Sequence, residues 1–324
     1  MRTSRDRARR CDFVCEIQAP DGKKSLLLGE VKLQISPRDV GPVLDQAKRS
    51  GQGIPFVVTR FLTPRTRDVL RATGASYADA TGNLRVATES PAVFIEREGG
   101  TTNPWAETRP IRSLKGPAAG RVVRALCDFT PPYGVRELAK RAEIPVASVS
   151  RVIAFLDEEA IVTREERGPI LRVDWLTLIR RWTQDYSLTG SNRATPVLAA
   201  RGLPQLFERL SNSKIRYAIT ASFAANRVAP AAPPKLATIY VEDARRAADT
   251  LGGLRSVETG SNVSLVEPFD AVVFERTVES EGLVYAALSQ VAADLLTGPG
   301  RSPSEAEELL QWMQKNEKAW RARA

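Results

Sequence analysis

The spacing of apolar residues divides the chain into three segments. Up to about residue 100, short alternating or continuous apolar runs stand between turn residues, and two stretches repeat at helical spacing. The runs predict strands at 11–19, 25–34 and 54–62, and two more short strands within 75–98 joined through Gly82 and Asn83. Stretches 36–51 and 63–74 open with Ser or Thr before Pro and close on Gly, which predicts helices. Strands alternating with helices predict an α/β domain over residues 1–100.

A different order of elements follows a polar linker at 101–113. The pattern predicts a helix at 115–129, a short helix at 135–143, a tight turn, and a third helix at 146–160. A two-stranded hairpin at 161–175 comes next and turns at Arg167 and Gly168. Helix, short helix, turn, helix and hairpin, in this order, predict a winged helix-turn-helix over residues 114–187.

The third segment, 193–324, mixes short strands with helices and predicts an α+β domain. Strands are expected at 215–220, 235–242, 262–268 and 270–278, with helices at 203–211 and 243–252. A closing amphipathic helix is expected over 303–324, with Ala306, Leu309, Leu310, Met313 and Trp320 on its apolar face.

Composition narrows the chemistry that this chain can perform. It holds no histidine, which excludes Ser-His-Asp and Cys-His catalysis and histidine metal ligands. Its three cysteines have neither zinc nor disulfide spacing. The net charge of +9, with five arginines in the first ten residues, indicates a polyanionic partner, although those arginines could equally form a solvated tail. No apolar run suits a membrane span and no secretory signal opens the chain, so we expect a cytoplasmic protein without membrane contact.

The third helix of the middle segment carries the pattern expected of a recognition helix. Its apolar face is predicted to hold Val149, Val152, Ile153, Leu156 and Ala160. The polar residues at the start of this helix would contact base edges. The acidic residues at its end would be repelled by phosphate, so that end is not expected to contact DNA. The predicted DNA-binding residues are Ser148, Ser150, Arg151, Arg136, Lys140, Arg164 and Arg167, with Arg172 in the wing and Arg121, Arg124 and Arg141 as further cations. A winged helix used only for protein contact is the alternative.

The stretch Ser25 to Ser36 raises a second hypothesis. Glu30 and Lys32 are in phase on one strand, and Asp12 lies one hairpin upstream. Two carboxylates can hold Mg²⁺ against a scissile phosphate, while a lysine orients water or neutralises developing charge. These three residues, with Gln46 on the following helix, are therefore candidate catalytic residues, and Asp12 and Glu30 are candidate metal ligands. A solvated pair on an edge strand is the other interpretation.

Asp12, Glu30 and Lys32, with Gln46, give residues 8–97 a resemblance to the PD-(D/E)xK restriction-endonuclease-like superfamily. The resemblance implies a Mg²⁺-dependent DNA endonuclease. An inactive member of that fold retained for DNA or protein binding is a second interpretation, and an unrelated α/β domain with a surface Glu-Lys pair is a third.

The string GASYADATGNLRV, followed by AVFIERE and the winged-helix stretch, resembles AbiEi-like antitoxins of type IV abortive-infection systems. This resemblance implies operator DNA as a ligand, autorepression, and neutralisation of a nucleotidyltransferase toxin. The third segment faintly resembles a nucleotidyltransferase itself, but its strand ATIYVED lacks the Asp-x-Asp pair that would hold Mg²⁺.

Together these observations predict a DNA-binding transcriptional regulator or antitoxin-like repressor. The alternative is a Mg²⁺-dependent endonuclease targeted by its winged helix. The expected partners are double-stranded DNA and a toxin or other protein, and the sequence leaves a homodimer open.

Overall fold

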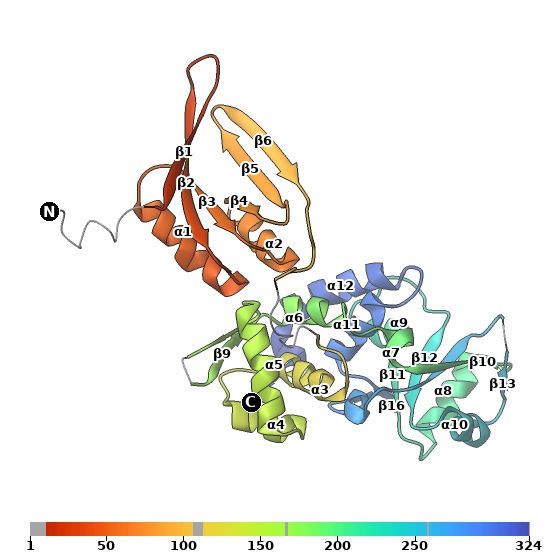
Figure 1. Ribbon diagram of the computed structural model, residues 1–324. Coiled ribbons are helices and arrows are strands. Elements are labelled where there is room, and N and C mark those ends of the chain that lie inside the picture. Colours follow the sequence, from red (N-terminus) through yellow and green to blue (C-terminus); the bar gives the residue numbers. More distant parts are fainter. Residues whose placement is uncertain (1–10, 106–112, 166–167, 258, 324) are drawn as a thin grey trace. The chain divides into compact units, whose positions relative to one another are not determined.

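The computed structural model describes residues 11–105, 113–165, 168–257 and 259–323. Within these ranges the protein is a mixed α/β structure with thirteen α-helices and several sheets (Figure 1). None of the helices in these ranges has the length and apolar character needed to cross a bilayer. The chain forms two compact units, the first built mainly from residues up to 110 and the second mainly from residues 111–324.

Unit one is a six-stranded sheet in which neighbours in sequence are neighbours in space. The hairpin β1–β2 is antiparallel, the pairs β2–β3 and β3–β4 are parallel, and the pairs β4–β5 and β5–β6 are antiparallel again. The strands are β1 (Phe13–Gln18), β2 (Lys24–Lys32), β3 (Ile54–Thr59), β4 (Ser76–Asp79), β5 (Leu84–Glu89) and β6 (Ala92–Arg97). The two parallel steps each need a crossover, and these crossovers are the helices.

Helices α1 (Val40–Arg49) and α2 (Pro64–Ala72) lie along this sheet (Figure 1). The predicted start of α2 is confirmed, because the Thr63 side chain accepts a hydrogen bond from the Thr66 backbone N–H at 3.1 Å. Side chains of both helices form one core with the sheet, which includes Leu44, Leu70, Val57 and Tyr77.

The stretch 75–98 forms three strands where two were predicted. The Asp79 carboxylate accepts hydrogen bonds from the backbone N–H groups of Thr81 and Asn83 and so builds a turn between β4 and β5. A second turn at Ser90 and Pro91 separates β5 from β6. The two turns therefore divide residues 75–98 into three strands.

Unit two begins with the elements of the predicted middle segment. These are α3 (Pro117–Asp128), β7 (Phe129–Thr130), α4 (Val135–Ala142), α5 (Val146–Glu158), β8 (Val162–Arg164), β9 (Ile170–Val173) and α6 (Trp175–Trp182). Residues 155–160, at the end of α5 and just beyond it, belong to unit one. Strands β8 and β9 pair antiparallel, as the hairpin pattern predicted. Between α4 and α5 the chain reverses at Glu143, whose φ of 52° is the left-handed conformation that ends many helices.

The remaining elements of unit two surround a seven-stranded mixed sheet in the order β13-β10-β14-β12-β11-β16-β15. Its strands are β10 (Arg193–Ala199), β11 (Tyr217–Thr220), β12 (Ala237–Val241), β13 (Leu254–Ser256), β14 (Val263–Glu267), β15 (Val278–Ser280) and β16 (Leu283–Tyr285). The helices are α7 (Leu188–Ser191), α8 (Leu203–Ser211), α9 (Ala221–Ala225), α10 (Ala244–Leu251), α11 (Leu288–Leu296), α12 (Ser302–Lys315) and α13 (Glu317–Trp320). The three-domain division stays a prediction.

Two predicted elements of this region are wrong. Residues 270–278 do not form one strand, because the Asp270 side chain accepts from the Val272 N–H and starts a 3-10 turn, Ala271–Phe274. The closing helix stops at Lys315, where the Asn316 side chain donates to the Trp312 carbonyl oxygen at 2.8 Å. The four predicted apolar positions within α12 itself are buried, as its amphipathic pattern required.

The segment after α12 returns to α3. Strand β17 (Ala322–Arg323) pairs parallel with β7. The guanidinium of Arg321 donates to the carbonyl oxygens of Leu126, Cys127 and Phe129, which lie at the end of α3 or just beyond it. These are the carbonyl groups that a helix end leaves without internal partners, so Arg321 caps α3 from the far end of the sequence.

Candidate functional site

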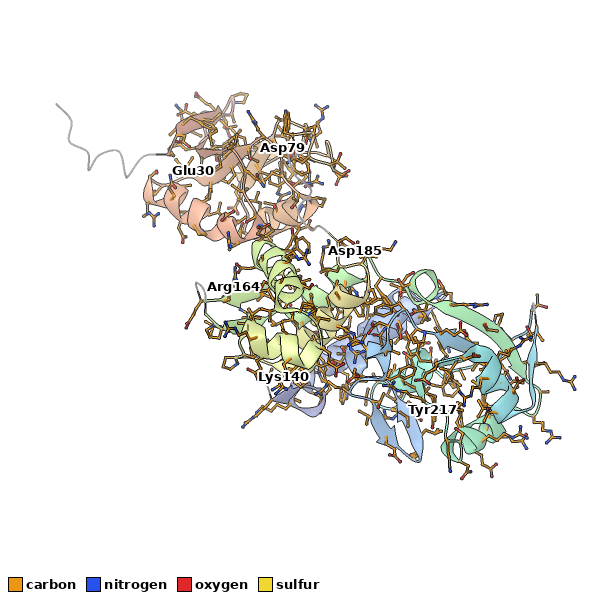
Figure 2. The ribbon with its side chains drawn as sticks, turned by 60° about the horizontal axis from the view of Figure 1, so that its bottom comes forward. Glu30, Asp79, Lys140, Arg164, Asp185 and Tyr217 are labelled. Atoms are coloured by element: carbon orange, nitrogen blue, oxygen red, sulfur yellow. The ribbon has the colours of Figure 1, made fainter. Side chains whose placement is uncertain are left out.

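Glu30 is a buried carboxylate, and the solvated-pair interpretation does not describe it. It lies on β2 within the sheet of unit one (Figure 2), in register with Val57, whose side chain belongs to the helix-covered core. Glu30 is 0% exposed. Its Oε2 accepts from the Lys32 ammonium at 3.1 Å, whereas Oε1 has no hydrogen-bond partner among the described residues. An incompletely paired buried carboxylate costs stability, so its presence needs an explanation.

A second acid-lysine pair on the same hairpin shows what a solvated pair looks like. Glu16 on β1 and Lys24 on β2 are 2.7 Å apart, and both side chains are about half exposed. That pair lies on the edge strand and its neighbour, where water can reach both groups. The hairpin thus carries one ordinary surface pair and one pair whose acid is out of water.

Asp12 lies beside Glu30 across the hairpin. Its backbone N–H donates to the Gly29 carbonyl oxygen, and continuing the register of Phe13 with Gly29 places Asp12 opposite Glu30. The Asp12 Oδ2 accepts from the Val31 N–H at 2.7 Å, and the residue is exposed. The structure therefore brings Asp12, Glu30 and Lys32 to one end of the hairpin, with Asp12 in water and Glu30 buried.

Gln46 lies on α1, the helix that packs against β2 and β3. It is half-buried, and its backbone carbonyl accepts from the Ser50 hydroxyl. Its side chain makes no hydrogen bond to the three other candidate residues within the part of the chain that the structure describes. Its placement on the helix after β2 is as predicted, and its part in a site stays a prediction.

The donor set can be tested against a magnesium ion. No group of three or more Asp, Glu, His or Cys side chains among the described residues is arranged to hold a metal. Two carboxylates are nevertheless a sufficient protein contribution, because Mg²⁺ keeps several waters and takes oxygens from a phosphate substrate. Glu30 Oε1 is an unused hard oxygen of the kind that this ion prefers.

The second candidate surface is the start of α5. Ala147, Ser150 and Arg151 are exposed there, and Ser148 is half-buried. The Arg151 guanidinium donates to the Ser148 hydroxyl at 3.3 Å, one helical turn away. The opposite face is buried as predicted at Val149, Val152, Ile153 and Leu156. Ala160 is an exception, because it lies beyond the helix in the left-handed region with φ of 54° and is exposed.

The predicted cations around α5 differ in how exposed their side chains are. Arg136 and Lys140 are exposed on α4, and Arg172 is exposed on β9. Arg164 is half-buried on β8, and Arg167 lies outside the described residues. Figure 2 shows Lys140 and Arg164 in the same unit. These residues stay candidate phosphate contacts.

Three further predicted cations are already paired. Arg124 is wrong as a DNA contact, since it is 1% exposed and its guanidinium donates to the Asp128 carboxylate. Arg121 pairs with Asp270 at 2.9 Å, and Arg141 pairs with Glu137 at 2.9 Å. Sequence spacing could have indicated the pairing of Arg124 and of Arg141, because each has an acid four positions away on its own helix.

Sequence reasoning missed a buried polar network in unit two. Asp294 on α11 is buried and accepts hydrogen bonds from the hydroxyls of Thr220, Tyr186 and Tyr240 and from the Gln290 amide. Gln290 also accepts from Arg124, which links Asp294 to the Arg124–Asp128 pair. Burial raises the pKa of Asp294, and the hydrogen bonds offset this only in part.

The composition of α11 explains why this network was missed. Its residues from Ser289 to Leu295 are all buried, so the helix has no polar face to mark it as amphipathic. The only signal was three polar residues, Ser289, Gln290 and Asp294, inside an otherwise apolar run. In water-free surroundings such groups must find partners in the protein.

Comparison of the chain with protein-family models, with curated proteins and with solved structures found no match. The resemblances to restriction-endonuclease-like nucleases and to AbiEi-like antitoxins therefore stay predictions.

Proposed function

We propose that the protein binds duplex DNA and that α3, α4, α5 and the β8–β9 hairpin act as a winged helix-turn-helix. The observation that carries the proposal is the two-sided character of α5. One face is buried at Val149, Val152 and Ile153, while Ser150 and Arg151 face solvent at its first turns. A helix held by one face and polar at the start of the other can enter a major groove.

The elements around α5 support this assignment. Glu143, in the left-handed conformation, ends α4 two residues before α5 begins, and a short turn of this kind suits a helix-turn-helix pair. The β8–β9 hairpin follows immediately and carries Arg164 and Arg172, which suit contacts to phosphates. Exposed Arg136 and Lys140 on α4 add positive charge without base specificity. A DNA-binding regulator or antitoxin-like repressor is the function that fits these features best.

The test begins by selecting duplexes that the full-length protein binds from a random-sequence pool. Fluorescence anisotropy then compares wild type with Arg151→Ala and Ser148→Ala on the selected duplex. We expect Arg151→Ala to weaken specific binding by about 1–3 kcal/mol, because it removes a base contact. Lys140→Ala should weaken all duplexes alike and lower the salt slope by about one.

Arg193→Ala is the matched control, since Arg193 is a strongly exposed arginine on β10. It should leave affinity and salt slope unchanged. Failure of the pool to yield an enriched duplex, or equal affinities for Arg151→Ala and wild type, would contradict the proposal.

A second function is favoured by the unused oxygen of Glu30. With Asp12 opposite and Lys32 at 3.1 Å, this carboxylate suits a site that cleaves phosphodiesters with Mg²⁺. Asp12 and Glu30 would hold the ion, which would supply an activated water and neutralise the phosphate. The Lys32 ammonium belongs to a half-buried side chain and would stabilise the negative charge that develops on the phosphate.

Supercoiled plasmid incubated with full-length protein and Mg²⁺ or Mn²⁺ tests this second function. Nicking that is lost in both Glu30→Gln and Lys32→Met supports it. The exposed pair on the same hairpin provides matched controls, Glu16→Gln and Lys24→Met, which should cut like wild type. If wild type leaves the plasmid intact with either metal, the protein is a binder and not a nuclease.

A further inference from the structure

A small cavity in unit two is lined by an unusual number of arginines. It lies between α3, the end of α4 and the loop after the 3-10 turn Ala271–Phe274. Its charged lining residues are Arg121, Arg124, Arg141 and Arg276, together with Asp128, Glu143 and Glu275. None of these four arginines lies on α5 or on the β8–β9 hairpin, so the cavity is separate from the proposed DNA surface on those elements.

Arg276 is the arginine of this cavity that has no acid of its own among the described residues. Arg121 pairs with Asp270, Arg141 with Glu137, and Arg124 with Asp128. The closest acid to Arg276 is again Asp128, 3.7 Å from its Nε.

The Asp128 carboxylate has little capacity left for Arg276. Its Oδ2 already accepts from two nitrogens of the Arg124 guanidinium, and its Oδ1 accepts from the Ser289 hydroxyl. The Arg276 Nε is buried and donates no hydrogen bond within the described part of the chain. The side chain as a whole is 28% exposed, so this one buried N–H, and not the whole charge, lacks a partner. A buried donor without an acceptor is unfavourable unless a ligand supplies one.

Two features of Arg276 are energetically unfavourable: its backbone conformation, and the position of its guanidinium against the same aromatic ring as the guanidinium of Arg141. Arg276 has φ of 53°, a conformation that non-glycine residues rarely adopt. Its guanidinium lies 4.6 Å from the centre of the Phe129 ring, and that of Arg141 lies 4.5 Å from the same ring. Two cations on one ring repel each other, and an anion bound in the cavity that both line would reduce that repulsion.

The size of the cavity limits what can enter. It encloses ≈ 60 Å³. A cavity of this size suits a small anion. The base and sugar of a nucleotide would have to remain outside it.

We propose that this cavity is a binding site for a phosphate group, held by Arg276 and Arg141, whose guanidinium groups both lie against the Phe129 ring. The Arg276 Nε–H donates to one phosphate oxygen. Arg141 donates to a second from the guanidinium nitrogens other than Nη2, which is paired with Glu137. Two sources share this chemistry: inorganic phosphate or the phosphate of a small molecule, and a backbone phosphate of DNA.

Isothermal titration and thermal unfolding of the full-length protein test the site, with inorganic phosphate as the probe. The phosphate is added in the low-millimolar range to a chloride buffer of constant ionic strength. We expect saturable binding to wild type and an unfolding midpoint that rises with phosphate concentration. Arg276→Gln should lose both responses, whereas Arg255→Gln, an exposed arginine on β13, should keep them.

Arg276→Gly separates a binding role from a structural one. Glycine adopts the left-handed conformation without strain, so this variant should unfold in chloride at the same temperature as wild type or higher, yet lose the phosphate response. A purely structural arginine would instead lower the midpoint in both variants without affecting the phosphate response.

Duplex binding in phosphate-free buffer identifies the source. If the occupant is a backbone phosphate, Arg276→Gln weakens duplex binding and lowers the salt slope by about one. If it is a free phosphate group, duplex affinity stays unchanged while titration with inorganic phosphate is lost in the variant. Equal responses of wild type and Arg276→Gln to both probes overturn the proposal.

Discussion

Each unit of the protein buries a carboxylate, and the two differ in how many hydrogen bonds they accept. Asp294 in unit two receives hydrogen bonds from Thr220, Tyr186, Tyr240 and Gln290, so its oxygens are fully used. Glu30 in unit one receives one from the described residues, from Lys32, and its second oxygen is unpaired. A saturated buried acid holds a fold together, whereas an unsaturated one carries a desolvation cost that hydrogen bonds do not offset.

The largest loss of stability is expected when Arg124, the cation of the Asp294 network, is replaced. Arg124→Met leaves the buried Asp128 with the Ser289 hydroxyl and the more distant Arg276, but without the guanidinium that donates two hydrogen bonds to it. We expect a loss of about 3–5 kcal/mol in the free energy of unfolding, measured by urea denaturation. Arg193→Met, an exposed arginine, should stay close to wild type. Equal stabilities of the two variants would mean that the network contributes little.

The next largest effect concerns Asp294 itself. Asp294→Ala removes the carboxylate that accepts from the hydroxyls of Tyr186, Tyr240 and Thr220. We expect a loss of about 3 kcal/mol, seen as a lower urea midpoint with an unchanged slope. Asp294→Asn keeps one acceptor oxygen and should lose less. An Asn variant as unstable as the Ala variant would show that charge, and not hydrogen bonding, holds the network.

Replacing the buried acid of unit one, Glu30, should not lower the stability of the protein, in contrast to replacing Asp294. Glu30→Met removes the unpaired oxygen and fills the space with an apolar side chain, while Lys32, about a third exposed, turns to water. We expect a change between none and about 1 kcal/mol of added stability in urea denaturation. A loss as large as that of Asp294→Ala would mean that Glu30 is a structural residue and would weaken the nuclease hypothesis.

The smallest effect is a contrast in pH dependence between two acids. Burial raises the pKa of Asp294, so its contribution is fully present below the ordinary value of 3.8 and is lost as pH rises through its folded pKa. Burial also acts to raise the pKa of Asp79 in unit one, but hydrogen bonds from Thr81, Asn83 and the Leu62 N–H lower it overall. The contribution of Asp79 is present above 3.8 and is lost as pH falls through its folded pKa.

Urea denaturation between pH 3 and pH 6 measures this contrast. The stability difference between wild type and Asp79→Asn should grow as pH rises, and the difference between wild type and Asp294→Asn should shrink. Parallel trends in the two variants would show that both acids feel the same environment.

Patterns that depend on local chemistry were predictable from the sequence. The cap of α2 and the buried face of α5 follow from residues within a few positions of each other. The phase of Glu30 and Lys32 on β2 was predictable for the same reason, because strand alternation needs only two residues of spacing. The mixed α/β character followed from the alternation of these elements.

What the sequence could not show depends on partners far away in the chain. The burial of Glu30 required knowing that β3 pairs with β2, and the loss of Arg124 as a surface cation required α11 to pack beside α3. Arg276 carries no sequence signal, since its importance comes from a backbone angle and from a shared acid on another helix. The DNA contacts and the metal stay predictions.

The cap that Arg321 places on α3 has a consequence for synthesis on the ribosome. The guanidinium and the carbonyl oxygen of Cys127 are 194 positions apart in sequence. At about 5–20 residues per second, translation delivers the cap roughly 10 to 40 seconds after α3 has emerged. The end of that helix, and β7 beside it, must wait unpaired for this interval. Nascent unit two therefore exposes an uncapped helix end until residues 321–323 have been made.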